Sequence, residues 1–461
     1  MTDEPSMLRP ICFVLMPFGT KQDETHRKIN FDTVFTAIIE PAVTAAGMDC
    51  IRADAETVGG IIHKPMFERL WFCEFAVADL TTANANVFYE LGVRHALRPF
   101  TTVLISAQGS PLPFDLGPVR RAHAYHLDDA GSPTMTHNDV AALTEQLRAV
   151  SSSVKRSIDS PVYQLLAGLG DWQAPDPDEV DAFHDRMAQV EELRQQLHAA
   201  SDTAEYAGTE AAKVELISFE SRLGKLEATT LGLAAELLLA YRGVEAYEEM
   251  IALVARLPEQ MSRLPMIREQ YALALNRSGD PSKAIRVLGT LIRERGPSSE
   301  TCGILGRVHK DRWEAELTAG RTAAAEGHLE RAIDTYVQGF EVDWRDYYPG
   351  INAVELMTLR DPDDPRIATL LPVVRYSAER AVEASPDYWG QATMLELAIL
   401  ANDVDDAQRR LGRALAASHD QMMIASTTAS LRRVLAAKRQ VGDDMSWLEA
   451  IVDQLSAAGR G

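Results

Sequence analysis

The first 160 residues alternate short apolar runs with segments in which apolar positions recur every three or four residues. The apolar runs lie at 11–16, 48–53, 75–79 and 102–106, with a fifth expected at 122–127. Helical spacing occupies 31–46, 61–74, 86–97 and 138–153. Short buried strands that alternate with amphipathic helices predict a mainly parallel sheet covered by helices on both faces. We therefore predict one parallel-sheet α/β domain over about residues 7–160.

The pattern changes after this domain. Residues 158–178 are richer in Pro and Gly and indicate a junction. Residues 180–197 then keep a/d-like apolar spacing within an acidic helix. A short coiled-coil seam is one interpretation, and a connecting helix that packs on its own neighbours is the other. The second is favoured because fewer than three clean heptads are present, so we assign 161–209 to a linker and connecting helix.

From about residue 210 to the end, the pattern is that of helix pairs. Residues 268–292, REQYALALNRSGDPSKAIRVLGTLI, form a helix, a Gly-Asp-Pro turn and a second helix with alanines on its packing face. Residues 394–418 repeat this layout with Asn402-Asp403 in place of Gly-Asp, and 328–343 fits the second helix of such a pair. The layout resembles a tetratricopeptide repeat. Because the period is irregular, we predict a degenerate all-α solenoid over 210–461.

Composition limits the classes of partner. The formal net charge of −21 argues against nucleic acid, whose phosphates require clustered Lys and Arg. No segment is long and apolar enough to span a membrane, and the N-terminus lacks the apolar region of a signal peptide. We expect a cytoplasmic protein whose partners are a small molecule and another protein, with a homo-oligomer left open. The four cysteines, which we expect to be reduced core residues without a metal or cofactor, are Cys12, Cys50, Cys73 and Cys302.

Residues 75–97, FAVADLTTANANVFYELGVRHAL, contain most of the candidate chemistry. An apolar strand ends in Asp79, and after a polar turn a helix begins that places Glu90 among apolar neighbours. Open α/β sheets bind ligands at the carboxyl ends of their strands, where Asp79 is expected. Each residue also has a structural interpretation: a turn-forming Asp79, Asn86 as helix N-cap, and a dipole-stabilising Glu90.

Residues 78–97, ADLTTANANVFYELGVRHAL, resemble the signature of the nucleoside 2-deoxyribosyltransferase-like superfamily. FVLMPFG at 13–19 and TVLI at 102–105 agree with that resemblance. These domains are Rossmann-like relatives of TIR domains and cleave N-glycosidic bonds of nucleosides, nucleotides or dinucleotides. The resemblance therefore implies a strand order of the flavodoxin or TIR kind.

The same resemblance assigns roles to individual residues. Cleavage of an N-glycosidic bond passes through an oxocarbenium-like transition state, which a carboxylate can attack or stabilise. The resemblance gives this catalytic role to Glu90, and lets Asp79 orient the ribose hydroxyls or protonate the leaving base. It further implies substrate contacts by Phe18, Gly19, Asp54 and Asn86.

A second resemblance lies in the helical region. ILGRVHKDRWEAE at 304–316 and AIDTYVQGFEVDWRDYYPGINAVELM at 332–357 resemble the TRAF-binding region of the apoptosis signal-regulating kinases. In those kinases a deoxyribosyltransferase-like domain precedes the helical region. The sequence contains no kinase Gly-rich loop, HRD or DFG, so we expect a bacterial, stand-alone version of the sensory half. Aromatic candidates for a partner surface are Trp313, Trp344, Tyr347, Tyr348 and Trp389.

Two functions from different classes follow. The first is an N-glycosidase or deoxyribosyltransferase-like domain that is regulated or recruited by the helical scaffold in bacterial stress or defence signalling. The alternative is a sensor that binds a nucleotide-derived ligand without turnover and acts through protein interactions. The sequence leaves open whether the chain is an enzyme.

Overall fold

A computed structural model describes the chain over residues 9–23, 26–52, 63–110, 123–152, 158–166, 172–223, 231–384, 388–417, 421–440 and 445–458. The chain divides into two compact units, residues 1–237 and 238–461, and the division falls within helix α9 (Leu231–Gly243). The domain boundaries that we place at 160 and 209 stay predictions.

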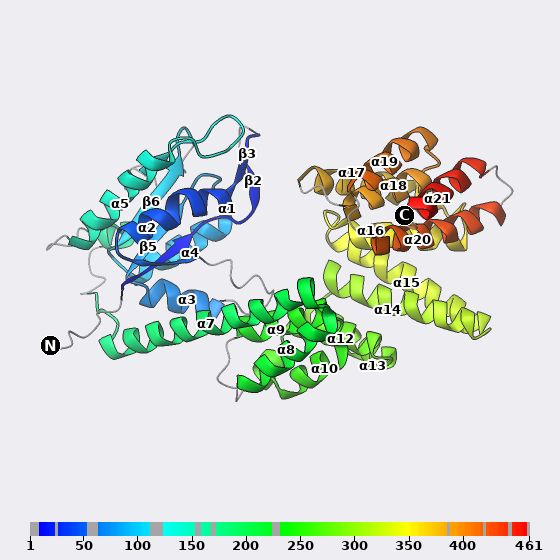
Figure 1. The fold of residues 1–461 in the computed structure, drawn as a ribbon, viewed down its shortest axis with the longest axis horizontal. Helices are drawn as coiled ribbons and strands as arrows, with labels where there is room; N and C mark the ends of the chain where they lie inside the picture. Colours follow the sequence, from blue (N-terminus) through cyan, green and yellow to red (C-terminus); the bar gives the residue numbers. More distant parts are fainter. Residues whose placement is uncertain are drawn as a thin grey trace. The chain divides into compact units, whose positions relative to one another are not determined.

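The first unit contains a five-stranded parallel sheet (Figure 1). Its strands are β1 (Ile11–Leu15), β4 (Asp49–Arg52), β5 (Phe75–Asp79), β6 (Thr102–Ala107) and β7 (His123–Tyr125). Their order is β4-β1-β5-β6-β7, with every neighbouring pair parallel. Counted along the chain this is the 2-1-3-4-5 order of flavodoxin-like doubly wound sheets. The parallel sheet predicted from strand and helix alternation is confirmed.

Both faces of the sheet are buried, as its nearly continuous apolar strands require. Cys12 and Val14 of β1 join the core on one face, which is covered by the helical segment 31–45 and by α5. Phe13 and Leu15 join the core on the other face, beneath α3, α4 and the start of α7. The helices of this unit are α1 (Phe31–Val34), η1 (Phe35–Ile39), α2 (Glu40–Ala45), α3 (His63–Phe72), α4 (Ala85–Leu97), α5 (Thr136–Ser152), α6 (Pro161–Leu165), α7 (Pro177–Ala207) and α8 (Thr209–Arg222).

Two local features depart from the sequence prediction. The polar segment after β1 forms an antiparallel hairpin of β2 (Thr20–Gln22) and β3 (Lys28–Asn30), in which Ile29 is buried. The helix expected at 31–46 contains a π-helical turn, η1. The hairpin was not predicted because only one of its residues carries an apolar signal.

Helix α7 packs on its own unit. The rings of Phe183 and Phe72 stack with centroids 5.3 Å apart. His184 Nε2 lies 3.1 Å from Glu74 Oε1. Further along the helix, the Arg194 guanidinium donates to both carboxylate oxygens of Glu236. This is the connecting helix of the sequence analysis rather than a coiled-coil seam.

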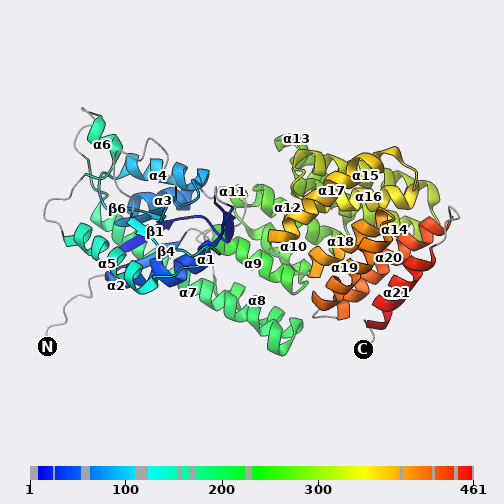
Figure 2. The same ribbon diagram turned by 90° about the horizontal axis from the view of Figure 1, so that it is seen from above.

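Among the described residues, every element from α8 onward is a helix, as predicted. Figure 2 shows the second unit as an assembly of helices that ends with α21. Successive helices pack from α11 to α19, and the alternate helices α12, α14, α16, α18 and α20 each contact the next. No helix in the described ranges is long and apolar enough to cross a membrane. The helices are α10 (Tyr247–Arg256), α11 (Glu259–Ser262), α12 (Pro265–Arg277), α13 (Pro281–Arg295), α14 (Ser299–Thr318), α15 (Thr322–Val342), α16 (Tyr347–Arg360), α17 (Pro365–Ala384), α18 (Tyr388–Leu400), α19 (Val404–Ala417), α20 (Gln421–Gln440) and α21 (Ser446–Ala458).

The two helix-pair turns predicted to be equivalent have the same construction. Gly279 adopts φ of 89°, and Asp280 accepts a hydrogen bond from Lys283 N–H at the start of α13. Asn402 adopts φ of 56°, and Asp403 accepts in the same way from Asp406 N–H. Asn is the residue that best replaces Gly in the left-handed region. Two different sequences therefore form the same turn.

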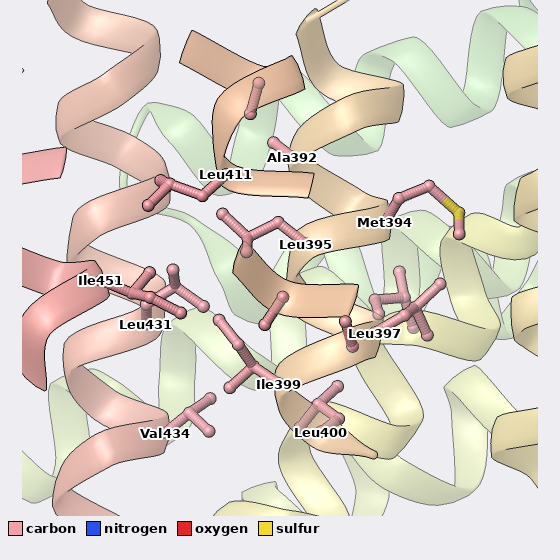
Figure 3. Packing of buried hydrophobic residues seen from close by; sticks show 14 of the residues in the cluster. Ala392, Met394, Leu395, Leu397, Ile399, Leu400, Leu411, Leu431, Val434 and Ile451 are labelled. Carbon is pink, nitrogen blue, oxygen red and sulfur yellow. The ribbon is translucent and has the colours of Figure 1, made fainter. Parts of the chain in front are cut away.

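The largest core of the second unit lies among its last helices. Figure 3 shows Leu395 and Ile399 of α18 facing Leu431 of α20. Both faces of α18 are apolar, and the helix is covered on several sides. The core of the last helices is therefore built around α18.

Candidate functional site

Asp79 lies at the carboxyl end of β5, beside the end of β1, where the strand order reverses. It is fully buried. Its Oδ1 accepts hydrogen bonds from Thr81 N–H at 2.9 Å and Thr81 Oγ1 at 2.5 Å, and its Oδ2 accepts from Tyr125 OH at 2.9 Å. Burial raises the pKa of Asp79 to about 6, although these donors act in the opposite direction.

Thr81 and Tyr125 connect this carboxyl to the rest of the sheet edge. Thr81 Oγ1 accepts from Ala107 N–H at 2.8 Å and lies 2.8 Å from Tyr125 OH. These hydrogen bonds therefore connect the carboxyl ends of β5, β6 and β7. Tyr125 was not identified as a partner from the sequence, because it is 46 residues from Asp79 along the chain.

Glu90 lies in the second turn of α4 and is half-buried. Val87 and Leu91 on the same helix are buried against the sheet, so Glu90 lies on the flank of the packing face. Burial raises the pKa of its carboxyl to about 7. Within the described part of the chain, the carboxylate has no hydrogen-bond or ion-pair partner. Strongly raised carboxyl pKa values are enriched at functional sites.

The N-cap of α4 is Asn84, not Asn86. Asn84 Oδ1 accepts from the backbone N–H of Asn86 at 3.0 Å and of Val87 at 3.3 Å. Asn86 itself is exposed in the first turn. The sequence presents two asparagines at neighbouring cap-compatible positions, and only the backbone geometry decides between them.

The loop after β1 is organised by Arg52, at the end of β4. The Arg52 guanidinium lies over the Phe18 ring at 5.1 Å and over the Phe35 ring at 4.7 Å, and it donates to Asp32 Oδ1 at 2.7 Å. Gly19 adopts φ of 59°, which allows the chain to turn away from the strand. One face of Phe18 is therefore occupied by a cation.

Asp54 lies outside the described residues. Among the five other candidates, all of which the structure describes, no hydrogen bond joins any two. Asp79 and the loop of Phe18 and Gly19 share the carboxyl edge of the sheet, whereas Asn86 and Glu90 lie on successive turns of α4. Of the two described candidate carboxylates, Asp79 is hydrogen-bonded at the sheet edge, whereas Glu90 on α4 has no partner among the described residues.

A second candidate site lies in the helical unit. A cavity of about 310 Å³ opens among α9, α12, α14 and α16. Tyr348, one of the predicted aromatic candidates, lines it and is 44% exposed. Trp344 and Trp389 are exposed to a similar degree, whereas Trp313 and Tyr347 pack against cores. The polar lining comprises Arg242, Asn276, Arg277, Ser299, Glu300, Arg307 and Asp346.

Comparison with known proteins assigns the family. The sequence model of the MAP3K TRAFs-binding domain matches residues 87–448. The chain belongs to this family. The matched segment runs from α4 into α21 and includes both stretches, 304–316 and 332–357, that carry the predicted resemblance. The TRAF-binding-like part of the sequence analysis is confirmed, whereas the deoxyribosyltransferase-like identity of the first unit stays a prediction.

Mitogen-activated protein kinase kinase kinases are among the relatives. The chain is 28% identical to human mitogen-activated protein kinase kinase kinase 6 over 349 residues, which cover 69% of the chain and 25% of the kinase. It is 28% identical to mouse mitogen-activated protein kinase kinase kinase 15 over 219 residues, covering 44% of the chain and 16% of the kinase. The matches thus span a quarter or less of the length of each of these two relatives.

Among solved structures, a tetratricopeptide repeat protein from Parabacteroides merdae aligns with a TM-score of 0.31 and 11% identity. That alignment covers 58% of this chain and 99% of the other.

Proposed function

We propose that the helical unit is a docking scaffold for protein partners, and that a TRAF-type protein is among them. The family match over residues 87–448 carries the proposal, because the family is named for that interaction. A cytoplasmic location, which the sequence favours, is part of this proposal.

The cavity among α12, α14 and α16 is our choice for the docking position. Tyr348 presents an exposed ring at its edge, and tyrosine is among the residues enriched at interaction hot spots. The ring packs edge-on against the buried ring of Tyr336, with centroids 6.3 Å apart, so it is held in place before a partner binds. Pre-organisation of this kind reduces the entropic cost of association.

Isothermal titration calorimetry, with the full chain and a purified TRAF domain, tests this proposal. We expect saturable binding to the wild type and at least about tenfold weaker binding to Tyr348→Ala, since a hot-spot side chain contributes about 2 kcal/mol or more. Tyr376→Ala is the matched control, because Tyr376 is also exposed but does not line the cavity. Absence of binding to the wild type refutes the TRAF assignment, and equal loss in both variants refutes the position.

A second proposal concerns the first unit, which we infer acts on or senses a nucleoside, nucleotide or dinucleotide. Its support is Glu90, half-buried, without a partner in the described chain, and with a pKa of about 7. Such a carboxylate can stabilise positive charge on a sugar ring. Asp79, whose oxygens already accept three hydrogen bonds, fits a positioning role at the same sheet edge.

Chromatographic detection of released base, with a panel of nucleotides and dinucleotides, tests this proposal. If the unit is an N-glycosidase, Glu90→Gln should lower kcat by at least about a hundredfold while substrate affinity changes only a few-fold. Equal base release by both proteins would remove Glu90 from catalysis. Binding of nucleotide without release by either protein would favour the sensor alternative.

A further inference from the structure

We propose that a second cavity of the helical unit, formed by α10, α12 and α13, is a docking site for an acidic peptide segment of a partner protein. This inference rests on the proposed scaffold function and adds to it a second docking position with a stated partner chemistry. The cavity has a volume of about 600 Å³. Apolar residues from the end of α10 meet basic residues of α12 and α13 in its lining, together with the ring of Tyr271.

The charge of the lining is one-sided. Arg268, Lys283 and Arg286 contribute three cations, and the lining contains no Asp or Glu among the residues that the structure describes. The whole chain, in contrast, has a formal net charge of −21. A concentration of positive charge on a strongly acidic chain selects an anionic partner.

Two of the three cations are available to a ligand. Arg268 is already engaged, since its Nη1 lies 2.5 Å from Glu294 Oε2. Lys283 Nζ lies 5.2 Å from the centroid of the Tyr271 ring and has no carboxylate partner in the described chain. Arg286, exposed and three residues further along α13, has no ion-pair partner there either. Residues three apart on a helix share a face, so both cations address the same bound group.

The uncharged part of the cavity favours a peptide over a nucleotide. Val254, Leu257 and Val287 provide aliphatic surface suited to an apolar side chain between two carboxylates. The one aromatic ring in the described lining, Tyr271, already has Lys283 over it, which removes a stacking face for a base. An extended segment with acidic residues flanking an aliphatic one therefore matches both the charge and the apolar surface.

Fluorescence polarisation with the full chain tests this assignment. The probe is a labelled peptide of repeated Glu-Glu-Leu units, and the control peptide has Gln in place of Glu. We expect the acidic peptide to bind more tightly than the control peptide. Its affinity should fall as the salt concentration is raised. Lys283→Glu with Arg286→Glu should weaken binding at least about tenfold, because like charges then face the peptide.

Matched variants keep the result interpretable. Arg331→Glu with Arg413→Glu imposes the same charge change at exposed positions outside the cavity, and should bind the peptide as the wild type does. Lys283→Gln with Arg286→Gln gives a milder test if the reversal disturbs folding. Equal binding of the Glu and Gln peptides, or equal loss in the control variant, overturns the proposal. Tight binding of ATP without binding of the peptide also overturns it, in favour of a nucleotide.

The TRAF titration separates this inference from the scaffold proposal. If a TRAF domain binds the wild type and Tyr348→Ala identifies its position, yet the acidic peptide does not bind, only the cavity assignment fails. If the peptide binds and no TRAF domain does, the cavity assignment stands and the TRAF-type partner is wrong.

Discussion

Lys310 on α14 and Glu355 on α16 are both buried, and their charged atoms lie 2.5 Å apart. Ser430 Oγ, on α20, donates to Glu355 Oε1 at 2.9 Å and lies 3.3 Å from Glu396 Oε1, on α18. One polar cluster thus joins four alternate helices of the solenoid. Burial and the neighbouring negative charge of Glu355 raise the pKa of Glu396 to about 8. The Glu396 carboxyl is therefore protonated at neutral pH, so that Glu355 carries the only negative charge of this pair.

This cluster predicts a pH dependence of stability. Between its ordinary pKa of 4.5 and its folded value of about 8, Glu396 holds a proton that the unfolded chain has released. The contribution of Glu396 to the free energy of unfolding therefore falls as pH rises through this window. We expect Glu396→Gln to remove that fall, so that its thermal midpoint gains on the wild type from about pH 5 to about pH 8. A constant difference, or the same trend in the exposed control Glu330→Gln, would contradict this interpretation.

Glycine at 306 permits the close approach of α14 and α15. A Cβ built on Gly306 would lie 2.7 Å from ring carbons of Tyr336, which is fully buried. Gly306→Ala should therefore lower the free energy of unfolding by about 1–3 kcal/mol through overpacking. Gly327→Ala on α15 is the control, since its Cβ would meet nothing within 4 Å, and it should add about 0.5–1 kcal/mol. Urea unfolding of both variants checks the opposite signs.

At the scale of elements, side chains from α4 and its C-cap donate hydrogen bonds to the carbonyl groups at the end of α3. Arg94 is fully buried, and its Nη1 donates to the carbonyl oxygens of Leu70 and Cys73, each at 2.8 Å. Arg98 Nε donates to Trp71 O at 2.7 Å. The last carbonyls of a helix lack partners within it, and here Arg94 of α4 and Arg98 at its C-cap supply the donors.

Arg94→Met should disrupt this arrangement. The apolar replacement fills comparable space but leaves buried carbonyls without donors, so we expect a loss of about 3–5 kcal/mol in the free energy of unfolding. Arg94→Lys should lose less but not recover the wild-type value, because an ammonium cannot reproduce the guanidinium fork. Thermal unfolding followed by circular dichroism measures both, and a wild-type midpoint for Arg94→Met would show that the cap is dispensable.

At the scale of the whole molecule, the chain has two compact units, and each core described above belongs wholly to one of them. Separate cores allow separate unfolding in multidomain proteins. We expect hydrogen exchange to show that Arg94→Met raises exchange within residues 1–237, and that Gly306→Ala raises it within residues 238–461. Increased exchange in both units from either change would mean that they unfold as one.

The sequence by itself determined the parallel sheet, the helical second unit and the equivalence of the turns at Gly279 and Asn402. These features follow from local patterns, because strand and helix periodicities and turn preferences act over a few neighbouring residues. The carboxyl-edge position of Asp79 was predictable for the same reason, as was the presence of Glu90 on the following helix.

Only the tertiary structure decided which side chains meet. Tyr125 binds Asp79 across 46 residues, Arg94 reaches the carbonyls of another helix, and Arg52 covers Phe18. Arg268 on α12 becomes a neighbour of Lys283 and Arg286 on α13 only when the two helices pack into one cavity. A polar side chain has no periodicity that reveals its distant partner, since that partner is selected by the three-dimensional packing of elements whose local patterns are independent of one another.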